Sequence, residues 1–140
     1  MNQSQGRLED VRVLIVDDDR DVIESIDAAF QSEGALTQLA SDGNEAVRIC
    51  RDDPPDLVVL DMMLPKRSGF FALEKIKGNA DSPLVIMITA NDGRRHQAYA
   101  ESLGVDRYLL KPVPLGRLLD TAVELVDARD AEDGDDEDDA

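Results

Sequence analysis

The stretch LVVLDMMLP, residues 57–65, places a carboxylate at the point where a buried strand ends. Its first four residues are apolar, which is typical of a strand covered on both faces. Asp61 follows them directly, and no basic residue nearby in the sequence neutralises it. A charge at the end of an apolar strand requires a chemical reason, which the neighbouring segments supply.

This stretch belongs to one of five strand–helix units along the chain. Apolar runs alternate with segments of helical period that end at glycine or proline. Strands that are apolar on both faces belong in a parallel sheet between two layers of helices, so the alternation predicts a doubly wound α/β fold. The order 2-1-3-4-5 is the common solution for a five-stranded parallel sheet. We expect strands at 11–16, 35–40, 56–61, 83–90 and 106–111, and helices at 21–33, 43–53, 69–77, 92–104 and 114–126.

The charge of the chain limits its possible partners, and its distribution indicates where the domain ends. The 31 acidic and 15 basic residues give a formal net charge of −16, which disfavours nucleic acid and an anionic membrane surface as direct partners. Residues 127–140 hold nine acids and one arginine, or −8 of that total. We therefore expect a flexible segment over 1–9, one domain over 10–127, and a disordered acidic tail over 128–140.

The sequence also favours a cytoplasmic location. The N-terminal residues lack an apolar signal core, and no apolar run approaches the ~20 residues that span a bilayer. Cys50 is the only cysteine, so no intramolecular disulfide is possible. We expect it to be a small buried apolar residue in a reducing compartment.

Polar residues stand where four of the expected strands end. Because the carboxyl ends of parallel strands share one edge of the sheet, these side chains converge near the switch point between strands one and three. They are Asp17, Asp18 and Asp19 after the first strand, Asp61 after the third, Thr89 after the fourth and Lys111 after the fifth.

The chemistry of this set points to phosphate and a divalent cation. At an effective dielectric near 20, two carboxylates ~4 Å apart repel by about 4 kcal/mol. A hard cation such as Mg²⁺ removes that conflict and leaves room for phosphate oxygens. Lys111 and Thr89 are donors suited to anionic oxygens. The set therefore suits a carboxylate that attacks phosphorus.

Four motifs in order resemble the receiver domain of two-component response regulators: VLIVDDD (13–19), LVVLDMMLP (57–65), VIMITA (85–90) and YLLKPV (108–113). The resemblance covers about residues 11–126. It implies a flavodoxin-like (βα)5 fold and a phosphorelay role in signal transduction, with no turnover as an enzyme. The implied phosphodonor is a sensor histidine kinase or a phosphotransfer protein.

The resemblance also implies the roles of individual residues. Asp61 would be the phosphoacceptor that forms the aspartyl phosphate. It would hold Mg²⁺ or Mn²⁺ together with Asp17, Asp18 and the backbone carbonyl of Met63. The phosphoryl group would be met by Thr89 and by Lys111.

The signal would leave through a second set of residues. Tyr108 would be an aromatic switch that turns inward when Thr89 moves to the phosphoryl group, and Pro112 would follow a cis peptide bond. The surface over residues 92–126 would contact a downstream protein or a second copy. We expect a stand-alone receiver without an output domain, because the chain ends soon after the last helix.

Several alternatives remain open. A degenerate receiver could act only as a scaffold. Asp17-x-Asp19 superficially matches an aspartate-nucleophile phosphatase, but that reading leaves Asp61 unexplained. We expect Asp19 to cap a helix and His96 to face solvent. The acidic tail could dock on a basic surface, such as Arg94 and Arg95, rather than act only as a solubilising extension.

Overall fold

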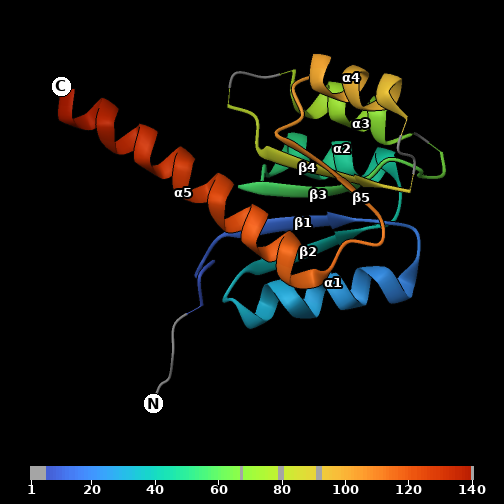
Figure 1. Ribbon diagram of the computed structural model, residues 1–140, viewed down its shortest axis with the longest axis horizontal. Helices are drawn as coiled ribbons and strands as arrows, with labels where there is room; N and C mark the ends of the chain where they lie inside the picture. Colours follow the sequence, from blue (N-terminus) through green and yellow to red (C-terminus); the bar gives the residue numbers. More distant parts are fainter. Residues whose placement is uncertain (1–5, 67, 79–80, 91–92, 140) are drawn as a thin grey trace.

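Five parallel strands form one sheet between two layers of helices (Figure 1). The computed structural model describes residues 6–66, 68–78, 81–90 and 93–139, with side chains up to residue 132. The sheet order β2-β1-β3-β4-β5 confirms the prediction. The strands are β1 (Arg12–Val16), β2 (Leu36–Ala40), β3 (Leu57–Asp61), β4 (Leu84–Thr89) and β5 (Arg107–Leu110). The helices are α1 (Arg20–Ser32), α2 (Gly43–Asp52), α3 (Gly69–Ile76), α4 (Arg94–Ser102) and α5 (Leu115–Asp139).

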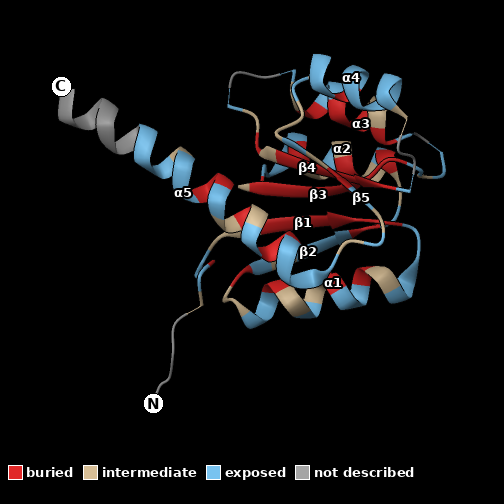
Figure 2. Ribbon diagram, viewed as in Figure 1, coloured by how far each residue is buried: buried red, intermediate tan, exposed pale blue. Residues whose placement is uncertain are grey.

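The sheet separates two apolar cores. Along each strand successive side chains point to opposite faces, so Val59 packs with α1 and α5 while Val58 and Leu60 pack with α2, α3 and α4. The central strands β1, β3 and β4 are almost wholly buried (Figure 2). This double burial explains why their sequences are continuously apolar, and it forces the polar residues to the strand ends.

Side-chain caps fix where three helices begin. The Asp19 carboxylate accepts hydrogen bonds from the backbone N–H groups of Asp21 and Val22, which starts α1 directly after the first strand's acids. Asp42 and Ser68 cap α2 and α3 in the same way. The expected capping role of Asp19 is therefore confirmed.

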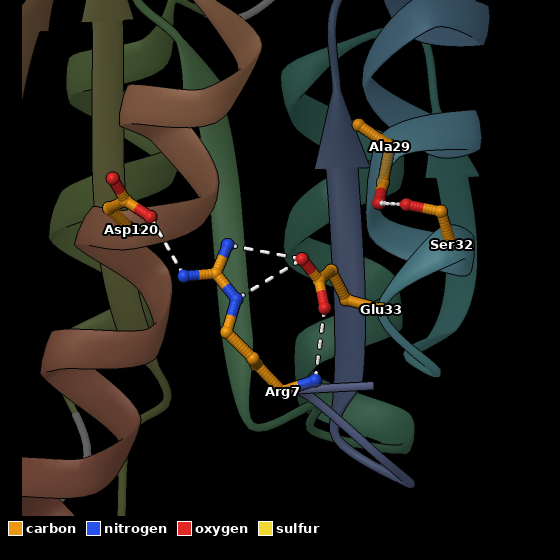
Figure 3. Close-up of polar contacts among 5 residues, drawn as sticks. All are labelled: Arg7, Ala29, Ser32, Glu33 and Asp120. Carbon is orange, nitrogen blue, oxygen red and sulfur yellow. Dashed lines mark hydrogen bonds and ion pairs between the residues drawn. The ribbon is translucent and has the colours of Figure 1, made fainter. Parts of the chain in front are cut away.

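The N-terminal segment is attached to the domain. Leu8 is 0% exposed and belongs to the core beneath α1 and α5. The Arg7 guanidinium lies between Glu33, at 3.0 Å, and Asp120 of α5, at 2.8 Å (Figure 3). The flexible segment expected over 1–9 stays a prediction, although a buried leucine and an ion-pair network pack residues 6–9 against the domain. Residues 1–5 lie outside the described part.

Helix α5 is longer than the sequence predicts. Its packed part includes Val126, which is buried, and Arg129 makes an ion pair with Asp56 at 3.5 Å. The backbone stays helical to Asp139 and projects beyond the sheet, away from α4 (Figure 1). An anchored helix propagates one residue at a time and no proline interrupts it, so the expected disordered tail begins inside a helix. This direction also takes the tail away from Arg94 and Arg95 of the same chain.

Within the described residues, none of the helices combines the length and the apolar character that crossing a membrane requires.

The burial of Leu8 predicts a stability effect. We expect Leu8→Ala to lower the free energy of unfolding by about 2–4 kcal/mol, because it leaves a cavity in the core. Urea unfolding measures this. Leu36→Ala is the matched control, since Leu36 is 57% exposed on an edge strand and should lose less than about 0.5 kcal/mol. Equal losses in the two variants would contradict the attached N-terminal segment.

The Arg7 network predicts a pH effect on stability. Hydrogen bonds from the backbone and side chain of Arg7 lower the pKa of Glu33 in the folded state. A lowered pKa stabilises the fold above the unfolded pKa, and that gain disappears as pH falls through the folded pKa. Glu33→Gln should therefore lower Tm at neutral pH, by less than Leu8→Ala does, and the difference from wild type should vanish in acid. A difference that persists in acid would show that packing, not charge, holds this contact.

Candidate functional site

Three carboxylates meet at the carboxyl edge of the sheet, as the sequence predicts. One oxygen from each of Asp17, Asp18 and Asp61 lies within 4.8 Å of the others. Asp17 and Asp61 are buried, with 2% and 4% exposure, whereas Asp18 is exposed. The cluster is therefore reached from solvent on the Asp18 side.

Strand pairing brings these residues together from distant parts of the chain. β1 pairs with β3, so that Asp17, just past the end of β1, stands beside Asp61, the last residue of β3. β4 pairs with β5, and the backbone N–H of Lys111 donates to the Thr89 carbonyl at 2.7 Å. The strand-end rule thus places all four side chains on one edge.

Lys111 is the cation within this cluster. Its Nζ lies 3.3 Å from Asp17 Oδ2 and 3.4 Å from Asp61 Oδ2. Burial and then the Asp17 carboxylate raise the pKa of Asp61 above its usual range, against the opposing effect of Lys111. Burial alone would lower the pKa of Lys111, but Asp61 and Asp17 outweigh it and raise that pKa. One lysine therefore does not balance two buried carboxylates and an exposed third.

The loop after β3 bends tightly around Asp61. The backbone N–H of Met63 donates to Asp61 Oδ1 at 3.2 Å, and that of Gly69 donates to the Met62 carbonyl at 2.8 Å. A Cβ on Gly69 would lie 2.5 Å from the Asp61 carbonyl oxygen, so only glycine fits. Lys66 has a φ of 65°, the left-handed region that side chains rarely adopt. The loop thus holds the backbone of Met63 against the Asp61 carboxylate.

The donor set fits a hard divalent cation. Carboxylate oxygens are the ligands that Mg²⁺ prefers, and an exposed Asp18 leaves room for water and phosphate oxygens. Burial first, and then the Asp17 carboxylate, raise the pKa of Asp61, and a cation beside the ionised carboxylates would offset both costs. Among the described residues, Asp17, Asp18 and Asp61 are therefore the group best placed to hold one. The carbonyl of Met63 remains a predicted further ligand.

The remaining predicted residues lie on β4, on β5 and in the segment directly after β5. Thr89 is 0% exposed at the end of β4. Tyr108 is half-buried on β5, and its hydroxyl lies 3.9 Å from the Met62 sulfur. The peptide bond between Lys111 and Pro112 is cis, as predicted. The movement of Thr89 and Tyr108 stays a prediction.

Sequence reasoning missed two contacts of the loop after Asp61. One joins Met62 to Tyr108, and a methionine gives no sequence signal for it. The other is the ion pair of Lys66 Nζ with Asp42 Oδ2 at 3.6 Å, which ties the loop to the start of α2. The run from Pro65 to Gly69 indicates a turn but not this partner.

Three other residues behave as expected. Asp19 uses its carboxylate to cap α1, which disfavours the phosphatase reading because that reading needs Asp19 as an acid beside Asp17. His96 is exposed on α4 and stacks on Phe70, with ring centroids 6.0 Å apart. Cys50 is a buried free thiol, and burial raises its pKa to about 11.

Comparisons with known proteins agree on one family. The profile described as "Response regulator receiver domain" matches residues 13–123. The response regulators MprA of Mycolicibacterium vanbaalenii and Mycobacterium tuberculosis are each 38% identical over 109 residues, which are 78% of this chain and 47% of each relative. The chain therefore spans about half the length of these curated relatives.

Solved structures give the same result. A CheY-like receiver domain protein from Methanospirillum hungatei is 27% identical, with a TM-score of 0.84 over 89% of this chain and 99% of that one. The CheX–CheY–BeF3–Mg²⁺ complex from Borrelia burgdorferi matches at 28% identity and TM-score 0.77, over 83% and 89%. The receiver domain of a Pseudomonas aeruginosa sensor histidine kinase matches at 26% and 0.73, over 80% and 94%, and has magnesium in its active site cleft.

The burial of the Asp61 charge, together with its repulsion by Asp17, predicts that Asp61→Asn stabilises the metal-free fold. A raised folded pKa means that ionised Asp61 opposes folding above that pKa, and the penalty disappears as pH falls below the unfolded pKa. We expect the variant to gain about 1 kcal/mol at neutral pH in EDTA, or on the order of 4 °C in Tm. Differential scanning calorimetry measures this.

Asp56→Asn is the matched control. Asp56 accepts from the backbone of Arg12 and pairs with Arg129, so its loss should give no gain. A lower Tm for Asp61→Asn than for wild type would contradict the charge conflict.

Proposed function

This chain belongs to the response regulator receiver domain family of two-component systems, and we propose that Asp61 is its phosphoacceptor. The observation that supports this choice is the convergence of Asp17, Asp18 and Lys111 on the Asp61 carboxylate. The family identity makes the domain a signalling module. Its individual residue roles, donors and outputs are our proposals.

The proposed reaction transfers a phosphoryl group to Asp61. A carboxylate oxygen of Asp61 forms a bond to phosphorus while the bond from phosphorus to the donor atom breaks, and the donor leaves with that electron pair. The Lys111 ammonium, already within 3.4 Å of Asp61, pairs with the phosphoryl oxygens as they arrive. Asp17 and Asp18 would hold Mg²⁺ or Mn²⁺ together with Asp61 and the Met63 carbonyl. When bound, the cation neutralises charge on the carboxylates and the phosphoryl oxygens.

The donor is proposed to be a sensor histidine kinase or a phosphotransfer protein. Both present a phosphohistidine, whose imidazole is a good leaving group. The exposed side of the cluster, at Asp18, leaves access for such a partner. A histidine kinase would take its phosphoryl group from ATP, which is a cytoplasmic metabolite. We therefore propose that the reaction takes place in the cytoplasm.

The output is proposed to pass through Thr89 and Tyr108. Thr89 is buried at the strand end beside Lys111, and we propose that its hydroxyl moves to bond a phosphoryl oxygen when one arrives. Tyr108 is half-buried on the neighbouring strand, and we propose that it turns further inward when Thr89 moves. The surface over residues 92–126, described from residue 93, would then bind a downstream protein or a second copy.

We further propose that the output of this domain is a protein contact and that the domain does not itself bind nucleic acid. The net charge of −16 supports this reading, because a phosphate backbone would repel the domain. The relatives are about twice as long as the matched region, so a further domain is a relevant question. The intact mass of the protein from its natural source would reveal one.

Intact-mass spectrometry after incubation with acetyl phosphate tests the proposed chemistry. We expect one phosphoryl adduct on wild type that requires Mg²⁺ and is absent from Asp61→Asn. Asp56→Asn, which changes a carboxylate outside the cluster, should still be labelled. An adduct retained in Asp61→Asn would refute the assignment. No adduct on wild type, where a control receiver is labelled, would favour a receiver that acts only as a scaffold.

A further inference from the structure

Two consecutive methionines follow Asp61, and their exposures are opposite. Met62 is 3% exposed, and its sulfur lies 3.9 Å from the Tyr108 hydroxyl. Met63 is 68% exposed, more than any other large apolar side chain among the described residues. The loop therefore exposes the side chain of Met63, two residues after the proposed phosphoacceptor.

The backbone fixes Met63 close to the reacting group. Its N–H donates to Asp61 Oδ1 at 3.2 Å, so the side chain starts within one residue's width of the carboxylate. Methionine is unbranched with three rotatable bonds. Its thioether is therefore able to cover a phosphoryl group on Asp61 or to swing away from it.

We propose that Met63 is a site of reversible oxidation by hydrogen peroxide, and that its sulfoxide shortens the lifetime of the aspartyl phosphate. This regulation rests on the proposed function. The sulfur lone pair forms a bond to one peroxide oxygen as the O–O bond breaks. The departing hydroxide takes a proton to become water, so the sulfur is oxidised by two electrons and the peroxide is reduced. Methionine sulfoxide reductase restores the thioether.

The physical reason for the effect is a change in polarity beside the acyl phosphate. The thioether is a weak acceptor, whereas the sulfoxide oxygen accepts hydrogen bonds strongly and holds water. Hydrolysis needs a water molecule at phosphorus. The sulfoxide would therefore hold water near phosphorus more strongly than the thioether does.

The other sulfur atoms of the described residues are protected, which makes the reaction selective. Met62 and Met87 are 3% and 0% exposed. Cys50 is 8% exposed, and burial raises its pKa to about 11, so the reactive thiolate is scarce. Exposure governs methionine oxidation, so Met63 should react first among them.

The first measurement is the rate of oxidation at each sulfur. The intact wild-type protein is treated with hydrogen peroxide, and peptide mass spectrometry follows the added oxygen at each position. We expect the sulfoxide at Met63 to form at least roughly tenfold faster than at Met62 or Met87, and Cys50 to stay unmodified. Comparable rates at the three methionines would overturn the proposal.

The second measurement is the lifetime of the phosphoryl adduct after removal of acetyl phosphate. We expect oxidation to shorten the wild-type half-life roughly threefold or more, well below the 10²–10⁴-fold of a positioned general base. The reductase should restore the original value. Met62→Leu should keep the response to peroxide, and Met63→Leu, compared with itself before treatment, should lose it. Met63→Gln, which carries a polar acceptor, should have a shorter half-life than Met63→Leu without any peroxide.

The outcomes distinguish a failure of the proposed function from a failure of the regulation by oxidation. No adduct on untreated wild type overturns the proposed function and the regulation with it. An adduct whose lifetime is unchanged when Met63 is oxidised overturns the regulation alone, as does a response that persists in Met63→Leu.

Discussion

The central constraint on this structure is an excess of negative charge at one edge of the sheet. Asp17 and Asp61 are both buried, and the Asp18 carboxylate lies beside them, yet Lys111 alone opposes the three. Burying carboxylates is costly, and each must have a partner to persist. The fold tolerates this cost because the surrounding strands are held by two apolar cores that contain none of these four charged residues. The stability of the scaffold therefore makes a strained, reactive centre possible.

Sheet register converts this local conflict into a defined geometry. Parallel pairing of β1 with β3 and of β4 with β5 sets which residues leave the sheet together. A shift of one residue in β3 would turn Asp61 to the opposite face and break the cluster. The charged residues that follow the apolar runs oppose such a shift, because it would move Asp17 or Asp61 away from the edge of the sheet and toward an apolar core. The sequence feature that specifies the fold is thus also the one that aims the carboxylate.

This dependence explains what could be predicted from sequence and what could not. Strand ends are marked by a change from apolar to charged residues, so the convergence of Asp17, Asp61 and Lys111 follows from strand order alone. Leu8 carries no periodic signal in a polar segment, and its burial emerges only when α1 and α5 are in place. The composition of the last residues does not predict the extension of α5, because acidic runs usually indicate disorder. In the structure the anchored helix continues through the acidic run.

Counting charge at the site suggests why a neutral donor stands at its edge. The three carboxylates and Lys111 sum to −2, which one divalent cation brings to zero. Converting the Asp61 carboxylate to an acyl phosphate replaces −1 by about −1.5 to −2, so the loaded site would be left negative by up to one charge. A second lysine would have over-neutralised the resting site. Under the proposed function, a buried hydroxyl such as that of Thr89 would respond only when the extra phosphoryl oxygens are present, and β5, which pairs with β4, would transmit that response.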